Sequence, residues 1–374
     1  MKKITVVGGG NAGCFTALYC GWYGRESEYE VELIYDPEIP PESVGQATVV
    51  ELPGLLWSAT GFNWYNNKID ATFKSGILYE DWGKKNSKVF HPFPADRMAM
   101  HFSPEKLHKS ILSSGHFKVK ESNVLDPDKI DSDYIFDCRG KPDTFDDYDE
   151  LINPTNACIL GKPNWDTTKD SWSRHIATPD GWAFVIPSES GTVGYCYNTT
   201  ITKPDSAKRN FLNIMDVDIG KNITYTNYIA KNPIVDDRIF LNGNRLFFLE
   251  PMESTATQAY IEVTRAIFEY LLPGRLNSDD VVTDINRYIL QLQNFILWHY
   301  QFGSKYNTLF WRHAKTLRFE DDKFNQYLSH AEKYDNDFTL PQSYGGSTKD
   351  ELYGQWPAYS FKTWYEGMTA KLNI

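Results

Sequence analysis

The segment Ile4-Thr5-Val6-Val7-Gly8-Gly9-Gly10-Asn11-Ala12-Gly13 decides the fold of the chain. A β-branched run precedes glycines spaced as G-x-G-x-x-G, and a helix-compatible stretch follows. We therefore expect a strand over 4–7 and a helix over about 12–22. In such a turn, backbone N–H groups and the helix N-terminus point at an anion, usually a dinucleotide pyrophosphate. The alternative is a glycine-rich turn that binds no ligand.

The glycines of this segment have separate predicted roles. Gly8 allows the sharp turn, Gly10 lets the backbone approach the phosphates, and Gly13 lets the helix pack closely on the strand. The segment 31–36 is predicted to be a second strand that ends in an acid, which in dinucleotide folds accepts the ribose hydroxyls. Asp36 lies somewhat late for that role, and the alternative is an acid that starts a turn before a proline.

The composition excludes several classes of protein. A net charge of −11 over 374 residues, with no basic stripe, argues against a nucleic-acid partner. No apolar run reaches the length of about 18 residues that a transmembrane helix needs, and the N-terminus enters a strand at once, so we expect neither a membrane span nor a signal peptide. The five cysteines lack C-x-x-C spacing and the histidines lack paired ligand spacing, which predicts reduced thiols, no metal site and a cytoplasmic location.

The order of the expected elements indicates an α/β flavoprotein. Dinucleotide-fold pieces come first, then short strands, another apolar strand, and helices; a nicotinamide dehydrogenase would instead have two consecutive domains. We expect a buried strand over 134–140 that ends in a glycine turn, and further strands at 181–187, 191–198 and 246–249. We also expect a loop over 143–150, and helices capped by Ser103 and by Ser278. The expected domains are a discontinuous Rossmann-like FAD-binding domain (1–150 and 236–275), a β-rich substrate-side region (151–235) and a helical C-terminal region covering the substrate site (276–374).

Four blocks carry a family resemblance when they are taken together and in order. They are Gly8–Gly13; Val44-Gly45-Gln46-Ala47-Thr48, followed by Ala71-Thr72-Phe73-Lys74 and Asp81-Trp82; Gly181–Pro187; and Leu249–Thr255. The set resembles the flavin-dependent halogenases of tryptophan-halogenase type. Those enzymes have a G-x-G-x-x-G flavin loop, a G-E-A-T-like loop, a lysine in an F-K context, a W-x-W-x-I-P signature and a P-L-E-S-T-G segment. The resemblance extends over about residues 1–315 in scattered blocks.

The resemblance implies an enzyme of the flavoprotein monooxygenase-type fold with two separate sites. Reduced FAD and O2 would oxidise a halide (chloride, bromide or iodide) to hypohalous acid, which would reach a lysine and halogenate an electron-rich aromatic ring. Because no second phosphate-binding glycine motif is evident, a separate flavin reductase or free reduced FAD would supply the electrons. The residues implied to hold the cofactor are Gly8, Gly10, Asn11, Ala12, Gly13, Asp36, Gln46, Ala47, Thr48, Asp137, Gly140 and Glu250.

Lys74 and Glu253 are the implied catalytic residues. The ammonium of Lys74 would hold the halogen as hypohalous acid or a haloamine and direct it toward one ring carbon; the alternative is a surface lysine on an alternating strand. Glu253 would stabilise the cationic ring intermediate and take its proton. Its alternative is a helix-start acid paired with the helix dipole, and Glu250 lies only three residues before it.

The remaining implied residues include departures from the family pattern. Backbone N–H groups of Ser254, Thr255 and Ala256 would bind the halide, although the family usually has glycine at the third position. Phe184 replaces the second tryptophan of the signature, and Gln46 replaces a frequent glutamate. The residues implied to separate flavin from substrate are Trp182, Phe184, Ile186 and Pro187. The alternative is that Trp182, Phe184 and Ile186 form the inward face of a strand.

Two other functions remain open at this stage. A flavin-dependent aromatic hydroxylase shares the glycine loop and the Asp137–Gly140 turn, but Lys74 and the block 181–187 argue against it. A flavin-binding sensor or scaffold without turnover is the other. The chain is shorter than typical tryptophan halogenases, so we expect a more open substrate site or a cover supplied by another subunit of a homo-oligomer.

Overall fold

The structure is a computed structural model that describes residues 1–41, 45–83, 87–93, 99–189, 191–319, 321–332 and 352–369. The chain forms two units, each with its own internal packing. The first unit comprises Met1–Ala71, Phe102–Leu151 and Asn227–Ile289, and the second comprises Thr72–His101, Ile152–Thr226 and Leu290–Ile374. This division differs from the expected domains because residues 72–101 belong with the β-rich region, and that region and the C-terminal helices form one unit.

The first unit is built on a mostly parallel six-stranded sheet. Strands β18, β9, β1, β2 and β8 run parallel to one another, and β17 pairs antiparallel with β18 at one edge. β1 becomes fully buried from Ile4 onward, as expected for a strand with helices on its faces. In sheet order, the strands are β17 (Ile234–Val235), β18 (Ile239–Leu241), β9 (Tyr134–Asp137), β1 (Lys2–Val7), β2 (Tyr29–Tyr35) and β8 (Lys118–Glu121).

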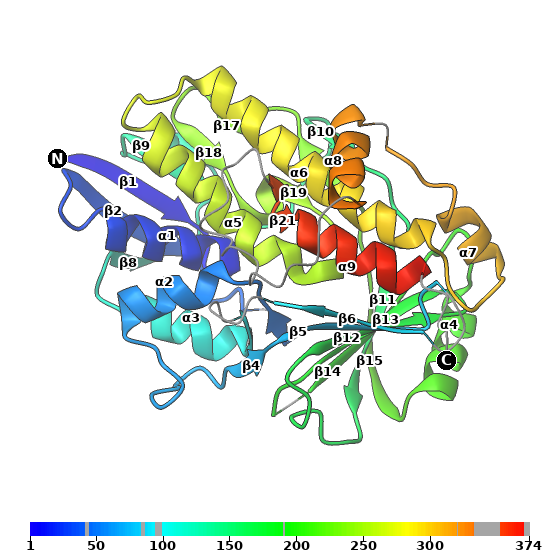
Figure 1. The fold of residues 1–374 in the computed structure, drawn as a ribbon. Helices are drawn as coiled ribbons and strands as arrows, with labels where there is room; N and C mark the ends of the chain where they lie inside the picture. Colours follow the sequence, from blue (N-terminus) through cyan, green and yellow to red (C-terminus); the bar gives the residue numbers. More distant parts are fainter. Residues whose placement is uncertain are drawn as a thin grey trace. The chain divides into compact units, whose positions relative to one another are not determined.

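Helix α1 (Asn11–Tyr23) is the central helix of this unit. Its residues from Ala12 to Gly21 are all buried, because it packs on β1 and β2 and also against α2, α3 and α5 (Figure 1). The other elements are β3 (Gln46–Ala47), α2 (Glu51–Thr60), α3 (Pro104–Leu112), η1 (Pro127–Lys129), β10 (Tyr148–Glu150), β16 (Tyr228–Ala230), η2 (Gly243–Arg245), β19 (Phe247–Phe248), η3 (Met252–Ser254), α5 (Thr255–Arg265), the π-helical η4 (Ala266–Leu271) and the start of α6 (Ser278–Gln301).

Two glycines of the first loop stand where no side chain fits. A β-carbon on Gly13 would lie 1.8 Å from the carbonyl oxygen of Gly8, and one on Gly8 would lie 2.4 Å from the carbonyl oxygen of Cys138. Gly8 also has a φ of +118°, which side chains rarely allow. A β-carbon on Gly10, in contrast, would have no heavy atom within 4 Å. The predicted roles of Gly8 and Gly13 in the turn and in close packing therefore agree with the structure.

Three local expectations require correction. The segment 143–150 contains the short strand β10, which pairs with β16 and is therefore not a plain loop. α6 begins at Ser278, but its capping acceptor is Asn277 Oδ1, which receives the N–H of Asp280 at 2.9 Å. Ser103 precedes α3 in extended geometry, but its side chain makes no capping hydrogen bond.

The second unit contains a seven-stranded sheet that is antiparallel except for the β12–β5 pair. A separate pair joins β4 (Thr72–Lys74) and β7 (Ala99–Phe102). In sheet order, the strands are β15 (Val217–Thr224), β11 (Ala157–Pro163), β14 (Thr192–Tyr197), β13 (Gly181–Ile186), β12 (Ser173–Thr178), β5 (Gly76–Glu80) and β6 (Lys88–Pro92). The other elements are α4 (Pro204–Ile214), the end of α6, α7 (Leu309–Ala314), α8 (Asp322–Glu332), β20 (Leu352–Tyr353), β21 (Trp356–Pro357) and α9 (Ala358–Thr369).

The two faces of β13 have different partners. Ala183 and Val185 belong to a core cluster that includes Phe211 of α4. Because successive residues of a strand point to opposite faces, Trp182 and Phe184 lie on the other face. That face is aromatic, since the Trp182 ring lies 4.8 Å from the ring of His175.

All five cysteines are buried and free, and burial raises the pKa of the Cys14 thiol to about 12. Within the described ranges, no helix combines the length and the apolar character needed to cross a membrane.

We expect Gly13→Ala to lower the free energy of unfolding by about 3 kcal/mol, because the added methyl group meets backbone that cannot yield. Gly10→Ala is the matched control, since the space beyond Gly10 is open and its φ of −75° suits alanine. Urea unfolding of both variants measures the difference. Equal midpoints for the two variants would contradict the close approach of Gly13 to Gly8.

Candidate functional site

The first turn of α1 forms an open cradle in the first unit. Gly10 occupies the N-cap position in an extended conformation, and no side chain caps the helix. The space in front of Gly10 is open, whereas Gly9 packs on the Tyr35 side chain. Uncapped N–H groups beside open space are the features that bind a phosphate at a helix N-terminus. Asn11 and Ala12 begin the helix at this cradle.

A second glycine loop, which belongs to none of the sequence motifs, packs on the same turn. Gly243 in η2 has a φ of +64°, and a β-carbon on it would lie 2.4 Å from Ala12 Cβ. The fully buried Asn242 holds the loop by donating from Nδ2 to Thr16 Oγ1 and Tyr260 O, each at 3.0 Å. The sequence signal was the turn-forming dipeptide Asn-Gly at 242–243, between two apolar runs.

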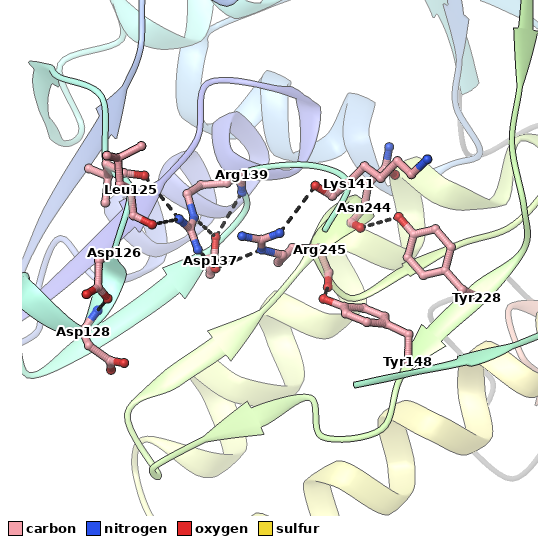
Figure 2. A network of polar contacts seen from close by, with 11 residues as sticks. Leu125, Asp126, Asp128, Asp137, Arg139, Lys141, Tyr148, Tyr228, Asn244 and Arg245 are labelled. Atoms are coloured by element: carbon pink, nitrogen blue, oxygen red, sulfur yellow. Dashed lines mark hydrogen bonds and ion pairs between the residues drawn. The ribbon is translucent and has the colours of Figure 1, made fainter. Parts of the chain in front are cut away.

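Asp137 lies at the end of β9 between two guanidinium groups (Figure 2). Arg139 binds it in bidentate fashion, with Nε–Oδ1 and Nη2–Oδ2 distances of 2.8 Å, and Arg245 Nε lies 3.3 Å from Oδ2. Burial alone would raise the pKa of this carboxyl, but the hydrogen bond and charge of Arg139 and the charge of Arg245 outweigh burial and lower the pKa.

This ion cluster joins several segments of the first unit. Arg139 Nη1 also donates to Leu125 O at 2.7 Å, and the Tyr148 hydroxyl donates to Arg245 O at 2.7 Å (Figure 2). The cluster therefore connects β9, η2 and β10. The Asp137 carboxylate, implied to touch the cofactor, is bonded to the two arginines, while Gly140 follows with a φ of +87° and open space around it.

The other residues implied to hold the cofactor are spread along the first unit. Asp36 Oδ1 accepts the N–H of Glu38 at 2.9 Å, so one carboxylate oxygen serves the turn after β2. Gln46 and Ala47 form β3, and Thr48 after them is fully buried; Val44 of that motif lies outside the described residues. Glu250 is fully buried, and its N–H donates to Asn227 Oδ1 at 2.8 Å.

Glu253 and Ser254 adopt an unusual backbone conformation immediately before α5. Their φ values are +64° and +55°, in the left-handed region that costs about 1–2 kcal/mol for a residue with a side chain. Glu253 is fully buried, and no side chain caps α5 at its N-cap, Ser254. Thr255 and Ala256 begin the helix. Two consecutive strained residues with a buried carboxylate indicate a functional position.

Lys74 ends β4 in the second unit and is fully buried. Its Nζ lies 5.1 Å from the centre of the Phe93 ring. Lysine is rarely buried, because removing an ammonium group from water is costly. The alternative of a surface lysine therefore does not describe Lys74. Phe73, the residue before it, is 43% exposed, as alternation along a strand requires.

A chain of hydrogen bonds connects β4 to the end of the Trp182–Pro187 block. The Thr72 hydroxyl has one proton, which it donates to Pro187 O at 3.0 Å, so His101 Nδ1 must donate to Thr72 Oγ1 at 3.1 Å. Burial, and then the charge of Lys74, hold the pKa of His101 well below its usual range. The ring is thus neutral, and its Nε2 accepts from Ser173 Oγ at 3.0 Å.

His101 was not predicted, although its place three residues before Pro104, where α3 begins, was visible in the sequence. The structure brings it together with Thr72 and Pro187, and thereby joins the Lys74 strand to the signature block. Trp182 is fully buried with its Nε1 unbonded among the described residues, and Phe184 lies over Gly194, where a β-carbon would meet its ring. Ile186 is half-buried at the end of β13.

Comparisons with known proteins agree on one family. The profile of the family described as "Tryptophan halogenase" matches residues 3–125 and 141–353. The tryptophan 7-halogenase RebH of Lentzea aerocolonigenes is 21% identical, over 87% of this chain and 82% of the relative.

Solved structures show the same fold. The tryptophan 6-halogenase SttH of Streptomyces toxytricini superposes with a TM-score of 0.79 at 18% identity, covering 99% of this chain and 91% of that one. BrvH, a flavin-dependent halogenase from Brevundimonas, gives 0.76 at 16% identity, covering 98% and 89%. This likeness confirms the expected fold class.

We expect Asp137→Asn to lower the free energy of unfolding by about 3 kcal/mol at neutral pH, because it leaves two partly buried arginines without their counter-ion. The folded pKa of Asp137 is lowered, so its contribution is present above the unfolded pKa of about 3.9 and is lost as pH falls through the folded value. The difference between wild type and variant should therefore narrow below about pH 4.

Urea unfolding at about pH 7, 5 and 3.5 measures that difference. Asp131→Asn is the matched control, since Asp131 is an exposed acid shortly before β9. A difference that stays constant down to the lowest pH would show that the carboxylate charge is not what holds the cluster together.

Proposed function

Because the chain belongs to the tryptophan halogenase family, a family of flavin-dependent enzymes, we propose that it halogenates an electron-rich aromatic substrate with reduced FAD, O2 and a halide. The single observation that carries the proposal is the buried Lys74. It stands on a strand that hydrogen bonds join to the end of the Trp182–Pro187 block.

The residues of the first unit fit an FAD cofactor. Gly10 leaves open space before an uncapped helix, and Gly243 approaches the same turn where a side chain would clash. The Gly8–Gly13 loop would hold the pyrophosphate through its N–H groups. The Gln46–Thr48 segment, Gly140 and Glu250 would contact the rest of the cofactor, as the family resemblance implies. The two arginines would keep Asp137 at the strand end as a support.

When bound, reduced FAD supplies with O2 the two-electron oxidation of the halide. Overall, the aromatic ring exchanges one hydrogen for the halogen, while FADH2, O2, halide and one proton are converted to FAD and two waters. Backbone N–H groups at the start of α5, in Ser254, Thr255 and Ala256, would bind the halide before it is oxidised. A separate flavin reductase would supply the reduced cofactor.

Lys74 would hold the oxidised halogen as hypohalous acid or a haloamine. Its burial keeps water away from a reactive oxidant, and its donors fix the halogen's direction toward the ring. The neutral His101 adds no second positive charge beside Lys74. Trp182, Phe184, Ile186 and Pro187 would separate the oxidation of halide from the halogenation of substrate.

Glu253 would serve the aromatic substitution itself. The ring becomes cationic when the halogen adds, and a carboxylate stabilises that charge and accepts the ring proton. Glu253 suits this role because its backbone is held in a strained conformation and its side chain is removed from bulk water.

We expect Lys74→Met to abolish halogenation, with product falling by about 10³-fold, because no ammonium donor then directs the halogen. The assay contains FAD, a flavin reductase, NADH, O2, one of three halides, and a panel of indoles and phenols, with product masses read by mass spectrometry. Lys162→Met, at an exposed lysine of the same unit, is the matched control.

FAD binding, followed by flavin fluorescence, should be the same in Lys74→Met and wild type. Halogenated product from Lys74→Met at the wild-type rate would refute the role of Lys74. Hydroxylated product formed without halide would show that the protein is an aromatic hydroxylase and not a halogenase. FAD binding with no product and no consumption of reduced flavin would indicate a flavin-binding protein without turnover.

We expect Glu253→Gln to lower the rate of halogenation by about 100-fold, because the amide preserves the shape but cannot accept the ring proton. Ring-deuterated substrate should then react more slowly than unlabelled substrate, since proton removal becomes rate-limiting. Glu26→Gln, at a side chain 87% exposed, is the control. An unchanged rate in Glu253→Gln would exclude this residue as the base.

A further inference from the structure

A cavity of about 420 Å³ lies next to the glycine loop in the first unit. Among the described residues, its lining includes Gly9, Tyr35, Pro37 and one face of α3 with His108 and Lys109. A cavity at the end of the second strand of a dinucleotide fold is where the adenosine half of such a cofactor is expected. For the ribose of that half, the sequence motifs offered Asp36.

The protonation of His108 follows from its one hydrogen bond. His108 is 5% exposed, and its Nε2 lies 2.7 Å from Asn11 Oδ1. An amide oxygen only accepts, so Nε2 carries the proton. Burial lowers the pKa of the imidazole to about 4, so the ring is neutral near pH 7 and Nδ1 carries a free lone pair.

The Nδ1 atom of His108 is a buried acceptor that lacks a donor. It makes no hydrogen bond among the described residues. The His108 side chain is one of those that line the cavity. Buried polar atoms are normally satisfied, and an exception calls for an explanation such as a missing ligand. Nδ1 has almost no water-accessible surface, so an O–H or N–H donor that enters the cavity would satisfy it once the atoms that cover Nδ1 shift on binding.

Asp36, the acid expected to accept the ribose hydroxyls, makes a hydrogen bond within its own turn. Asp36 Oδ1 accepts from Glu38 N, and Asp36 is not among the described residues that line the cavity. His108, in contrast, is bonded to Asn11, the first residue of α1, where the pyrophosphate is expected. The ribose is the group bonded directly to that pyrophosphate, whereas the adenine amino group lies one sugar further away.

We propose that His108 Nδ1 accepts a hydrogen bond from a ribose hydroxyl of the adenosine diphosphate half of the cofactor, with Asn11 fixing the tautomer that makes this possible. The assignment rests on the proposed function only in taking FAD as the ligand. It makes α3, through His108, a determinant of nucleotide specificity in place of the acid at the end of β2.

Two substitutions of His108 distinguish the role of Nδ1 from the role of Nε2. The side-chain N–H of His108→Gln reaches the position of Nε2 and keeps the bond to Asn11, but offers no acceptor at the position of Nδ1. His108→Asn places an acceptor oxygen near the position of Nδ1 and loses the bond to Asn11. Ser110→Ala, on the same helix but outside the described lining of the cavity, is the control.

Isothermal calorimetry with ADP, 2′-deoxy-ADP, 3′-deoxy-ADP and inosine diphosphate tests the proposal. We expect the wild type and Ser110→Ala to bind ADP about five- to tenfold more tightly than one of the deoxy analogues, and inosine diphosphate as tightly as ADP. In His108→Gln, ADP binding should weaken by the same factor and the preference should disappear. In His108→Asn the preference should persist.

Several results would overturn the assignment. These are equal wild-type affinities for ADP and both deoxy analogues, a preference that survives in His108→Gln, or a loss of affinity with inosine diphosphate, which would make the adenine amino group the donor. Circular dichroism checks that each variant folds. If a variant does not fold, the affinities of the wild type for ADP and its analogues still show whether a ribose hydroxyl is recognised. FAD titrations distinguish failure of the His108 proposal from failure of the proposed cofactor site. A wild type that binds FAD but shows no ribose preference refutes only the role of His108. A wild type that binds neither FAD nor ADP refutes the proposed cofactor site as well.

Discussion

The first unit depends on a backbone approach that leaves no room for a side chain. A β-carbon on Gly13 would lie 1.8 Å from the carbonyl oxygen of Gly8. One on Gly8, whose φ is +118°, would lie 2.4 Å from the carbonyl oxygen of Cys138. This approach brings the start of α1 onto the ends of β1 and β9. The uncapped helix N-terminus then faces open space at Gly10, so the packing of the unit and the cradle for an anion have the same geometric origin.

Buried polar side chains hold other segments to this centre. Asn242 Nδ2 donates to three acceptors on α1 and α5, which fixes Gly243 against Ala12. Asp137 at the end of β9 binds Arg139 and Arg245. A buried charge or amide is costly without partners, so each of these groups favours one arrangement of the segments around it.

The main constraint in the second unit is the burial of Lys74, whose side chain is removed from water. Proton counting makes His101 Nδ1 the donor to Thr72, while burial and the charge of Lys74 lower the pKa of His101 and keep its ring neutral. On β13, alternation separates a core face, with Ala183 and Val185, from the aromatic face with Trp182. A structural role and a site role can therefore belong to the same strand, on opposite faces.

The sequence by itself determined the features that are local in the chain. The β-branched run and the glycine spacing specified β1, the turn and α1, because these properties act within a few residues. The motifs also selected Lys74 and Glu253. Tertiary structure decided what depends on distant partners: that residues 72–101 join the second unit, that Gly243 packs on Ala12, and that Asp137 binds Arg245. Such contacts join residues about a hundred or more positions apart, and a single sequence carries no local signal of which distant groups will satisfy each other.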